Sequence, residues 1–216
     1  MKLIDRLLDL VYPPRCIFCG RILPSSAVGV CRACAACVPR VPAGDRRWDI
    51  KHIEWCAAPL LYQGTVREAL LRYKFNGVTA YGRIFADFMA KSIDEIDFSC
   101  DIITWVPLSK RRLRKRGYDQ AQILAEELAK RLELPCGKLL EKRIDNKPQS
   151  ATGDAEKRKE NARGVYVCPD MEAVRGKRIL LVDDIVTTGA TLAECARVLK
   201  AAGCAAIYAA AAATRQ

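Results

Sequence analysis

The sequence lacks a run that could span a membrane. Its alanine-rich segment, residues 205–213, is too short and too weakly apolar to cross a bilayer. A secretory signal is also missing, because residues 1–12 carry Asp5 and Asp9 in their apolar stretch and have no small-residue cleavage site. Histidine occurs once, and His52 lies in an apolar strand context that favours packing over metal binding. These absences predict a cytoplasmic protein.

Acidic residues are in the minority. The chain has 25 Asp and Glu against 36 Lys and Arg, which gives a formal net charge of +11. An excess of this size favours anionic partners: phosphorylated metabolites, nucleic acid or acidic proteins. Charge alone does not choose among them. Half of the residues are hydrophobic, as in an ordinary globular protein.

The composition changes near residue 48. Residues 1–47 begin with apolar residues at helical spacing and continue into a stretch rich in Cys, Pro, Gly and Arg that has no periodicity. Residues 48–216 alternate between predicted strands and predicted helices. We therefore predict two domains, an N-terminal helix with a metal module in 1–47 and an α/β domain in 48–216. The α/β domain should contain a mostly parallel sheet with helices on both faces.

The apolar patterns also predict the individual elements. Strands are predicted at residues 54–62, 101–106, 178–182 and 206–212. Helices are predicted at residues 65–73, 81–96, 119–132 and 191–202, the first of them with a capping box of Thr65 and Glu68. Residues 110–117 are predicted to form a basic loop, and residues 145–164 a mobile polar loop.

Five of the eleven cysteines lie between residues 16 and 37, and four of them form two CxxC pairs. Cys16 pairs with Cys19, and Cys31 pairs with Cys34. Each CxxC presents two sulfurs to one ion, so that two of them complete a closed tetrahedral site for structural Zn²⁺. Unligated thiols or a redox pair are the alternative. The spacing, in a chain without a secretory signal, favours zinc. Cys37 is a spare whose spacing fits less well.

A second pattern follows the predicted strand at 178–182, where two carboxylates precede a turn rich in threonine and the start of a helix. Its residues are Asp183, Asp184, Thr187, Thr188, Gly189, Ala190 and Thr191. The backbone N–H groups and the dipole at a helix N-terminus favour a phosphate. Two carboxylates beside a phosphate make sense if the ligand also carries hydroxyl groups or an associated Mg²⁺. The pattern is neither a Walker A loop nor a GxGxxG fingerprint. A strand–turn–helix without a ligand is the alternative.

The whole string from residue 179 to residue 191 resembles the signature of type I phosphoribosyltransferases, four hydrophobic residues followed by D-D-x-x-x-T-G-x-T. The resemblance implies that Asp183 and Asp184 contact the ribose hydroxyls of phosphoribosyl pyrophosphate. It also implies that the segment from Thr187 to Thr191 wraps the 5-phosphate, with Mg²⁺ bound alongside the ligand.

Further motifs resemble the ComF/GntX family, which joins a four-cysteine finger to a phosphoribosyltransferase domain. They are Lys74 in LRYKF, Val-Pro-Leu at 106–108, RGYDQA at 116–121, Lys-Pro-Gln at 147–149, Arg158 with Asn161, and residues 182–191. One departure is Asp119, which stands where the family usually has Asn. An ionised Asp cannot donate a hydrogen bond, so this side chain cannot make a ligand contact in which the family's Asn would donate.

Two basic regions could serve the same site. By fold analogy, the cluster at 110–116, which ends at Arg116, would face the pyrophosphate or a nucleic-acid backbone; a solvated charged surface is the alternative. Residues 145–163 would form a hood over the site, in which Lys147, Arg158 and Arg163 close on phosphates. A surface loop without a ligand is the alternative for this segment.

The family resemblance implies a cytoplasmic protein of natural competence that handles incoming single-stranded DNA beside a ComFA-like ATPase. A binding protein for phosphoribosyl pyrophosphate is the first hypothesis. The second is an active transferase that moves phosphoribose to a nucleobase or amine and releases pyrophosphate. The third is a zinc-finger adaptor with a vestigial ribosyl site. No acceptor site is recognisable in the sequence, and no base-binding hood, which weighs against a salvage enzyme. Base stacking on Trp48, Trp55 and Tyr118 is one way in which DNA could bind.

Overall fold

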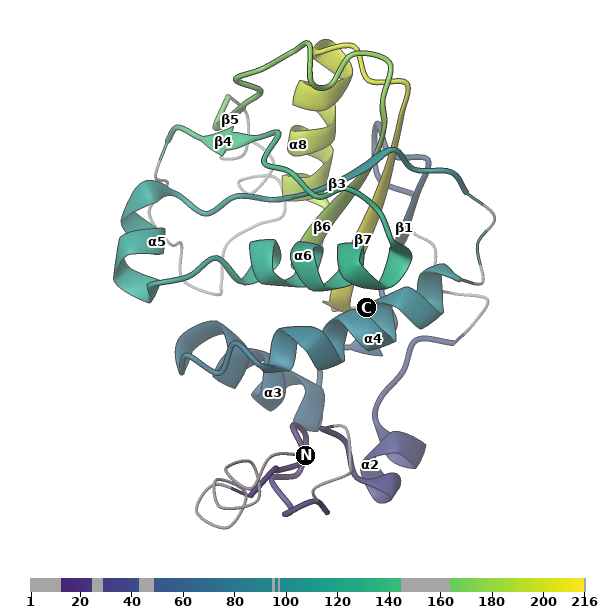
Figure 1. The fold of residues 1–216 in the computed structure, drawn as a ribbon, viewed down its shortest axis with the longest axis vertical. Coiled ribbons are helices and arrows are strands. Elements are labelled where there is room, and N and C mark those ends of the chain that lie inside the picture. The colour runs from purple at the N-terminus through teal and green to yellow at the C-terminus, as the bar shows by residue number, and fades with distance from the viewer. Residues whose placement is uncertain are drawn as a thin grey trace.

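One parallel sheet organises the chain in a computed structural model that describes residues 13–24, 29–42, 49–94, 96, 98–144 and 164–215. The strand order is β1-β7-β6-β3, and every pairing in this sheet is parallel (Figure 1). These strands are β1 (Trp55–Ala57), β3 (Ile102–Trp105), β6 (Arg178–Val186) and β7 (Ala206–Thr214). The short strand β2 (Leu60–Leu61) pairs with the end of β7. The predicted N-terminal helix and Trp48 lie outside the described residues.

Helices cover both faces of the sheet, as predicted. α4 (Tyr81–Ile93) and α6 (Gln120–Leu132) pack on one face, and α8 (Ala190–Ala201) packs on the other (Figure 1). The continuously apolar sequence of strand β6 is explained by its place between the two layers of helices. Leu180 and Val182 point into the core cluster of α4 and α6, whereas Ile179 and Leu181 point into the cluster of α8. Both sides of a central parallel strand are buried, so both sets of side chains are apolar.

Several elements differ from the sequence prediction. The basic segment is not a loop but the helix α5 (Lys110–Arg116), because the Ser109 hydroxyl accepts from the backbone N–H of Arg112 at 3.3 Å and Gly117 ends the helix at φ 84°. The prediction of a capping box formed by Thr65 and Glu68 was also wrong. Helix α3 (Gly64–Phe75) begins after Gln63, and no side chain caps it among the described residues.

Strand bounds differ as well. The single strand predicted at 54–62 is divided into β1 and β2 around Pro59, which has no backbone N–H to donate. Strand β6 continues four residues beyond the prediction, since Asp183 pairs in register with Ala211 and Ile185 with Ala213. Three short elements were not predicted: α2 (Arg32–Cys37), and β4 (Glu141–Lys142) with β5 (Tyr166–Val167), which form an antiparallel pair.

The zinc module, which we define as residues 13–24 and 29–42, packs against α3 and α4 at the end of the molecule opposite α8 (Figure 1). The Phe18 ring makes edge contacts with Phe85 and Phe88 of α4, at centroid distances of 6.5 and 5.9 Å. Gly29 lies so close to α4 that an added Cβ would stand 2.0 Å from Ile84 Cδ1. The module therefore shares one hydrophobic core with the helices on that face of the sheet.

No helix in the described ranges is both long and apolar enough to span a membrane.

Candidate functional site

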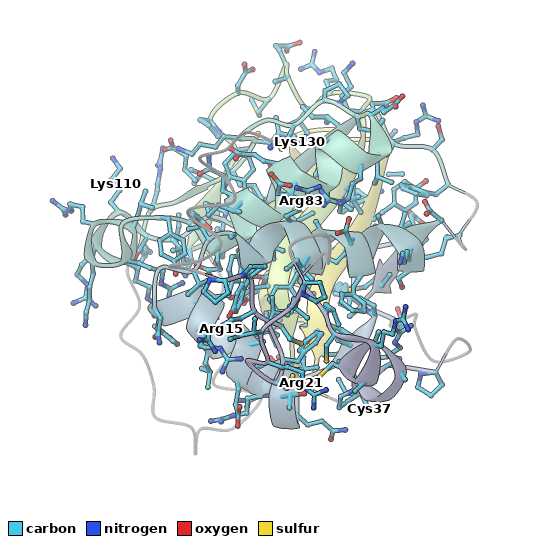
Figure 2. All side chains as sticks on the ribbon, turned by 60° about the horizontal axis from the view of Figure 1, so that its bottom comes forward. Arg15, Arg21, Cys37, Arg83, Lys110 and Lys130 are labelled. Atoms are coloured by element: carbon cyan, nitrogen blue, oxygen red, sulfur yellow. The ribbon has the colours of Figure 1, made fainter. Side chains whose placement is uncertain are left out.

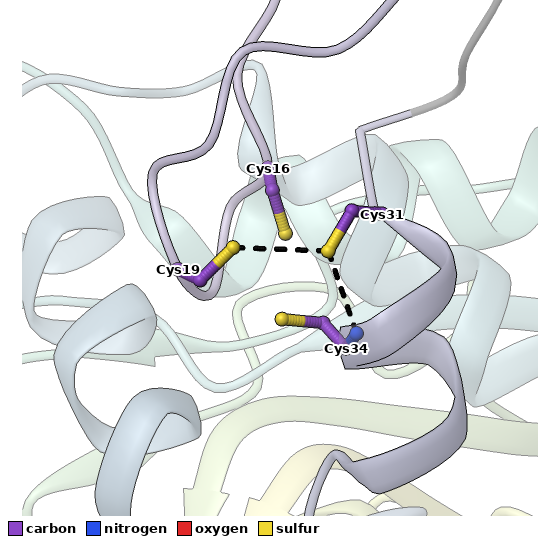
Figure 3. A group of neighbouring side chains, drawn as sticks. All are labelled: Cys16, Cys19, Cys31 and Cys34. Atoms are coloured by element: carbon purple, nitrogen blue, oxygen red, sulfur yellow. Dashed lines mark hydrogen bonds between the residues drawn. The ribbon is translucent and has the colours of Figure 1, made fainter.

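The four cysteines of the two CxxC pairs converge on one point (Figure 3). Their sulfur atoms all lie within 4.8 Å of one another, and Cys19 Sγ is 3.7 Å from Cys31 Sγ. The first pair lies on a tight turn in which the Gly20 N–H donates to the Cys16 carbonyl and Gly20 takes a positive φ of 74°. The second pair lies at the start of α2, where the Cys34 N–H points at the Cys31 sulfur at 3.4 Å.

This arrangement fits a zinc ion. A tetrahedral Zn²⁺ with Zn–S distances of about 2.3 Å needs sulfurs about 3.8 Å apart, close to the separation found here. Burial opposes ionisation of Cys16, but backbone N–H groups of Cys19, Cys31 and Phe18 lower the pKa of its thiol to about 6. Four thiolates leave no open coordination position for water or a substrate, so a zinc ion here would have a structural and not a catalytic role. Cys37 is exposed at the end of α2 and outside the cluster.

The second candidate site lies at the carboxyl end of β6. Asp184 is buried, and its Oδ2 lies 2.7 Å from Nζ of Lys74 on α3. Burial alone would lower the pKa of Lys74, but the Asp184 carboxylate outweighs it and holds that pKa above its ordinary value. Lys74 is therefore a cation at neutral pH, and it compensates the charge of a buried carboxylate.

Asp183 differs from its neighbour. It is half-buried, and its Oδ1 accepts from the backbone N–H of Asp184 at 2.7 Å. Burial first, and then the charge of Asp184, raise its pKa well above the ordinary value. The raised pKa means that ionising Asp183 costs free energy. A sugar hydroxyl or a cation that reaches Asp183 would reduce this cost, because it would stabilise the ionised form.

The threonine turn joins β6 to α8. Thr187 and Thr188 are exposed, and Gly189 precedes the first helical residue, Ala190. Gly189 is buried with φ 70°, and an added Cβ would stand 2.9 Å from Ile50 Cδ1. Only glycine fits this position without strain. The half-buried Thr191 follows in the first turn of α8, where the Ala190 N–H donates to the Thr188 hydroxyl at 3.4 Å. The backbone N–H groups at a helix N-terminus are suited to a phosphate.

Helix α5 adds positive charge near this edge, since it follows β3 directly. The Arg116 guanidinium bonds to the Gln120 side chain and stands 5.0 Å from the centroid of the exposed Phe75 ring. The other predicted hood cations, Lys147, Arg158 and Arg163, lie outside the described residues.

Asp119 has a structural role that the sequence did not reveal. It is the N-cap of α6: Oδ1 accepts from the Ala121 N–H at 3.1 Å, and Oδ2 accepts from the Leu108 N–H at 2.8 Å. Both carboxylate oxygens accept, whereas asparagine has one acceptor oxygen. In this chain Asp119 therefore holds the loop after β3 against the start of α6.

Sequence reasoning missed the role of Lys74, which it noted only as part of a motif. The only available signal was a lysine in an otherwise apolar helix face next to Tyr73, because its partner Asp184 lies 110 residues further along the chain. Of the suggested base-stacking residues, Trp55 is buried in the core beside Phe98 and Tyr208. Tyr118 is half-buried and donates to the Tyr73 carbonyl.

Comparison with known proteins agrees with this geometry. The family model for the phosphoribosyl transferase domain matches residues 118–216, and that for the double zinc ribbon domain matches residues 7–45. Competence protein ComFC of Bacillus subtilis is 31% identical over 191 residues, which cover 85% of this chain and 70% of that protein. Competence protein F of Haemophilus influenzae is 27% identical over 197 residues, or 88% of this chain and 80% of that protein.

A solved structure, the glutamine phosphoribosylpyrophosphate amidotransferase from B. subtilis complexed with ADP and GMP, is 18% identical. It covers 65% of this chain and 30% of its own, with a TM-score of 0.44. That likeness is too weak to add to the assignment, which rests on the sequence relatives and the family models. On that basis the chain belongs to the ComF family, with a type I phosphoribosyltransferase fold behind an N-terminal zinc ribbon.

Proposed function

We propose that this protein binds phosphoribosyl pyrophosphate with Mg²⁺ at the carboxyl end of β6. The observation that carries the proposal is the pair of carboxylates, Asp183 and Asp184, next to a glycine-containing turn at the N-terminus of α8. Carboxylates accept hydrogen bonds from the ribose hydroxyls, and the N–H groups of the turn donate to the 5-phosphate. Mg²⁺ bound with the ligand would neutralise the pyrophosphate and make it a better leaving group.

Lys74 explains how the site tolerates two adjacent carboxylates. Its ammonium group compensates Asp184, so the pair carries one net negative charge instead of two when Asp183 is ionised. A ligand with two hydroxyl groups and several phosphates requires such a balance, because two uncompensated carboxylates would repel the phosphates. Arg116 and the other cations of α5 would meet the pyrophosphate end of the ligand.

Calorimetric titration of the zinc-loaded chain with phosphoribosyl pyrophosphate and Mg²⁺ tests the proposal. We expect saturable binding in the wild type, its loss in Asp183→Asn/Asp184→Asn, and wild-type affinity in Glu172→Gln, which removes an exposed carboxylate paired with Arg175. Asp183→Asn alone keeps the ion pair of Lys74 and Asp184. If this variant loses binding while its thermal stability stays at the wild-type level, the loss is due to the missing carboxylate. If the wild type does not bind the ligand, the turn between β6 and α8 has a structural role only.

We further propose that the protein acts in natural competence, in the cytoplasm, beside a ComFA-like ATPase, and handles single-stranded DNA. The relatives named competence proteins support the process, and the relative named DNA utilization protein YhgH of Escherichia coli, 33% identical over half of this chain and 46% of that protein, supports the link to DNA. Helix α5 offers the charge: Lys110, Arg114 and Lys115 are exposed on it, and it contains no acidic residue. Lys110 stands at the edge of the molecule, apart from Arg15 and Arg21 of the zinc module (Figure 2).

Fluorescence anisotropy with labelled oligothymidine tests the DNA proposal. Affinity should fall steeply with salt, and Lys110→Ala/Arg114→Ala/Lys115→Ala should weaken binding and reduce the salt slope. Binding of the sugar ligand, which is held in a shaped loop, should depend less on salt. Unchanged DNA affinity in the triple variant would exclude α5 as the contact surface.

An active transferase remains the second candidate function, favoured by the intact carboxylate pair and turn. Release of pyrophosphate in a screen of nucleobases and amines, lost in Asp183→Asn/Asp184→Asn, is the expected result for an enzyme. Catalysis would then consist mainly of positioning and electrostatic stabilisation. If neither ligand binding nor pyrophosphate release is found, the ribosyl site is vestigial, and DNA handling and the zinc-finger adaptor are the functions left.

A further inference from the structure

Helix α3 contacts the zinc module through Arg72 and the proposed ligand site through Lys74. Arg72 Nη2 donates to the backbone carbonyls of Ile17, at 2.6 Å, and Phe18, at 3.4 Å. These two carbonyls belong to the residues between Cys16 and Cys19, which form the first metal knuckle. Arg72 therefore contacts the backbone of the segment whose conformation a bound metal ion would fix.

An aromatic contact runs parallel to this hydrogen bond. The Phe18 ring packs edge-on against Phe85, and Phe85 packs against Tyr73 at a centroid distance of 5.8 Å. Tyr73 is fully buried, and its hydroxyl donates to the Gln120 carbonyl at 2.7 Å. The knuckle is thus linked to the start of α6 as well as to α3.

Arg72, Tyr73 and Lys74 are consecutive, and successive side chains of a helix leave its axis about 100° apart. Arg72 reaches the zinc module, Tyr73 fills the core, and Lys74 reaches Asp184 at 2.7 Å. A rotation or shift of α3 that follows a relaxed knuckle would therefore move the Lys74 ammonium away from Asp184. The charge balance of the carboxylate pair depends on that contact.

We propose that Arg72 is a positioning residue that couples the zinc site to the carboxylate pair, so that the metal-loaded knuckle raises affinity for a phosphorylated ribose. This inference rests on the proposed function of the site. Coupling between two binding sites is reciprocal. The sugar phosphate must therefore raise the affinity for zinc by the same factor as zinc raises the affinity for the sugar phosphate.

The test uses the full zinc-loaded chain and the variants Arg72→Ala and Arg72→Lys. Arg67→Ala is the matched control, because Arg67 is an exposed arginine on the same helix. Calorimetry gives the affinity for phosphoribosyl pyrophosphate with Mg²⁺. Equilibrium competition with a chromogenic chelator gives the zinc affinity with and without that ligand. Asp183→Asn/Asp184→Asn corrects for zinc that free pyrophosphate groups take up in solution.

We expect Arg72→Ala to retain one zinc per chain but to bind the ligand about fivefold or more weakly, the lower end of typical coupling. The ligand should raise zinc affinity by a similar factor in the wild type and in Arg67→Ala, and should not raise it in Arg72→Ala. Arg72→Lys should recover part of both effects, since lysine can still donate to a carbonyl. A general loss of stability would weaken ligand binding without removing the reciprocal effect.

Two results would overturn the inference. If Arg72→Ala binds the ligand with wild-type affinity, α3 is held by its own buried residues, Val66, Ala69 and Leu70, and needs no support from the knuckle. If the wild type binds the ligand but the ligand leaves zinc affinity unchanged, the two sites are independent and only the coupling fails. Absence of ligand binding by the wild type would instead reject the proposed function together with the coupling.

Discussion

The zinc module and the parallel sheet differ in what holds their backbones in place. In the described part of the module a few backbone hydrogen bonds, such as the turn bond from the Gly20 N–H to the Cys16 carbonyl, accompany the short helix α2. In the sheet, β6 and β7 are paired along most of their length, and both are buried on two faces. Metal binding must supply most of the ordering free energy in the first case, and backbone pairing with apolar burial supplies it in the second.

The two regions nevertheless bury their side chains in one core. Ile17 and Phe18 of the module belong to the same cluster as Leu180 and Val182 of β6. Loss of the metal should therefore destabilise not only the module but also the helices that pack against it. We expect the two regions to differ in local order, because only the module should lose its order without zinc. We expect them to share their stability against unfolding, because they share a core. Four experiments test these expectations.

Loss of a buried metal ligand should have the largest effect. Cys34→Ser removes one of four thiolates, so zinc content should fall from about one to zero per chain and the module should unfold. Elemental analysis measures the zinc, and amide hydrogen exchange should show lost protection in the zinc module while β6 and β7 stay protected. Cys37→Ser is the matched control on the same helix, and it should keep its zinc. Retained zinc in Cys34→Ser would contradict the assignment.

Truncation of the aromatic anchor should come next. Phe18→Ala should lower the free energy of unfolding by about 3–5 kcal/mol, comparable with about 2–5 kcal/mol for Leu180→Ala in the sheet. Urea unfolding measures both, and a shared core predicts a single transition in each variant. Ile22→Ala, at a residue that is 55% exposed, should change stability by less than about 0.5 kcal/mol. A sheet whose unfolding is unaffected by Phe18→Ala would show that the two regions are independent.

A smaller effect is expected where the module touches α4. Gly29→Ala would place a Cβ in contact with Ile84 and force a non-glycine residue to φ 63°, which should cost about 1–3 kcal/mol. Adding Ile84→Ala should relieve the contact but not the backbone strain. Gly20→Ala is the control, because φ there is 74° and nothing lies within 4 Å of the added atom. Equal thermal stability of the two glycine variants would contradict the close contact.

The smallest effect concerns an ion pair at the start of β6. Arg178 lowers the pKa of Asp101 from 3.8 to about 2, mainly through side-chain hydrogen bonds, of which the shorter is 2.7 Å. Because the folded pKa lies below the unfolded one, this contribution to stability is present above about pH 4 and is lost as the pH falls to about 2. Urea midpoints of wild type and Asp101→Asn should therefore differ at about pH 6 and converge near about pH 2. A constant difference would exclude the carboxylate as the cause.

Much of the fold could be predicted because it depends on local patterns. Buried runs such as 178–182 identified the strands, and the four cysteines identified the module. The failures have two different origins, one local and one long-range. Helix α5 depends on a Ser109 cap and a Gly117 stop around a segment whose charge suggested a loop. The ion pair of Lys74 and Asp184 depends on how α3 packs across the sheet end, which no local pattern encodes.

The alanines of strand β7 have one more consequence. Residues 209–213 are all alanine, all at most 1% exposed, and divided between the two core clusters. In most cores, truncation of a large side chain is the common damaging change, but here there is almost nothing to truncate. The strand is a thin spacer between two helical layers, so substitutions that enlarge it should be the damaging ones. Among variants of this chain, the centre of the sheet should tolerate Ala→Gly better than Ala→Leu, the reverse of the usual preference for bulk in a buried strand.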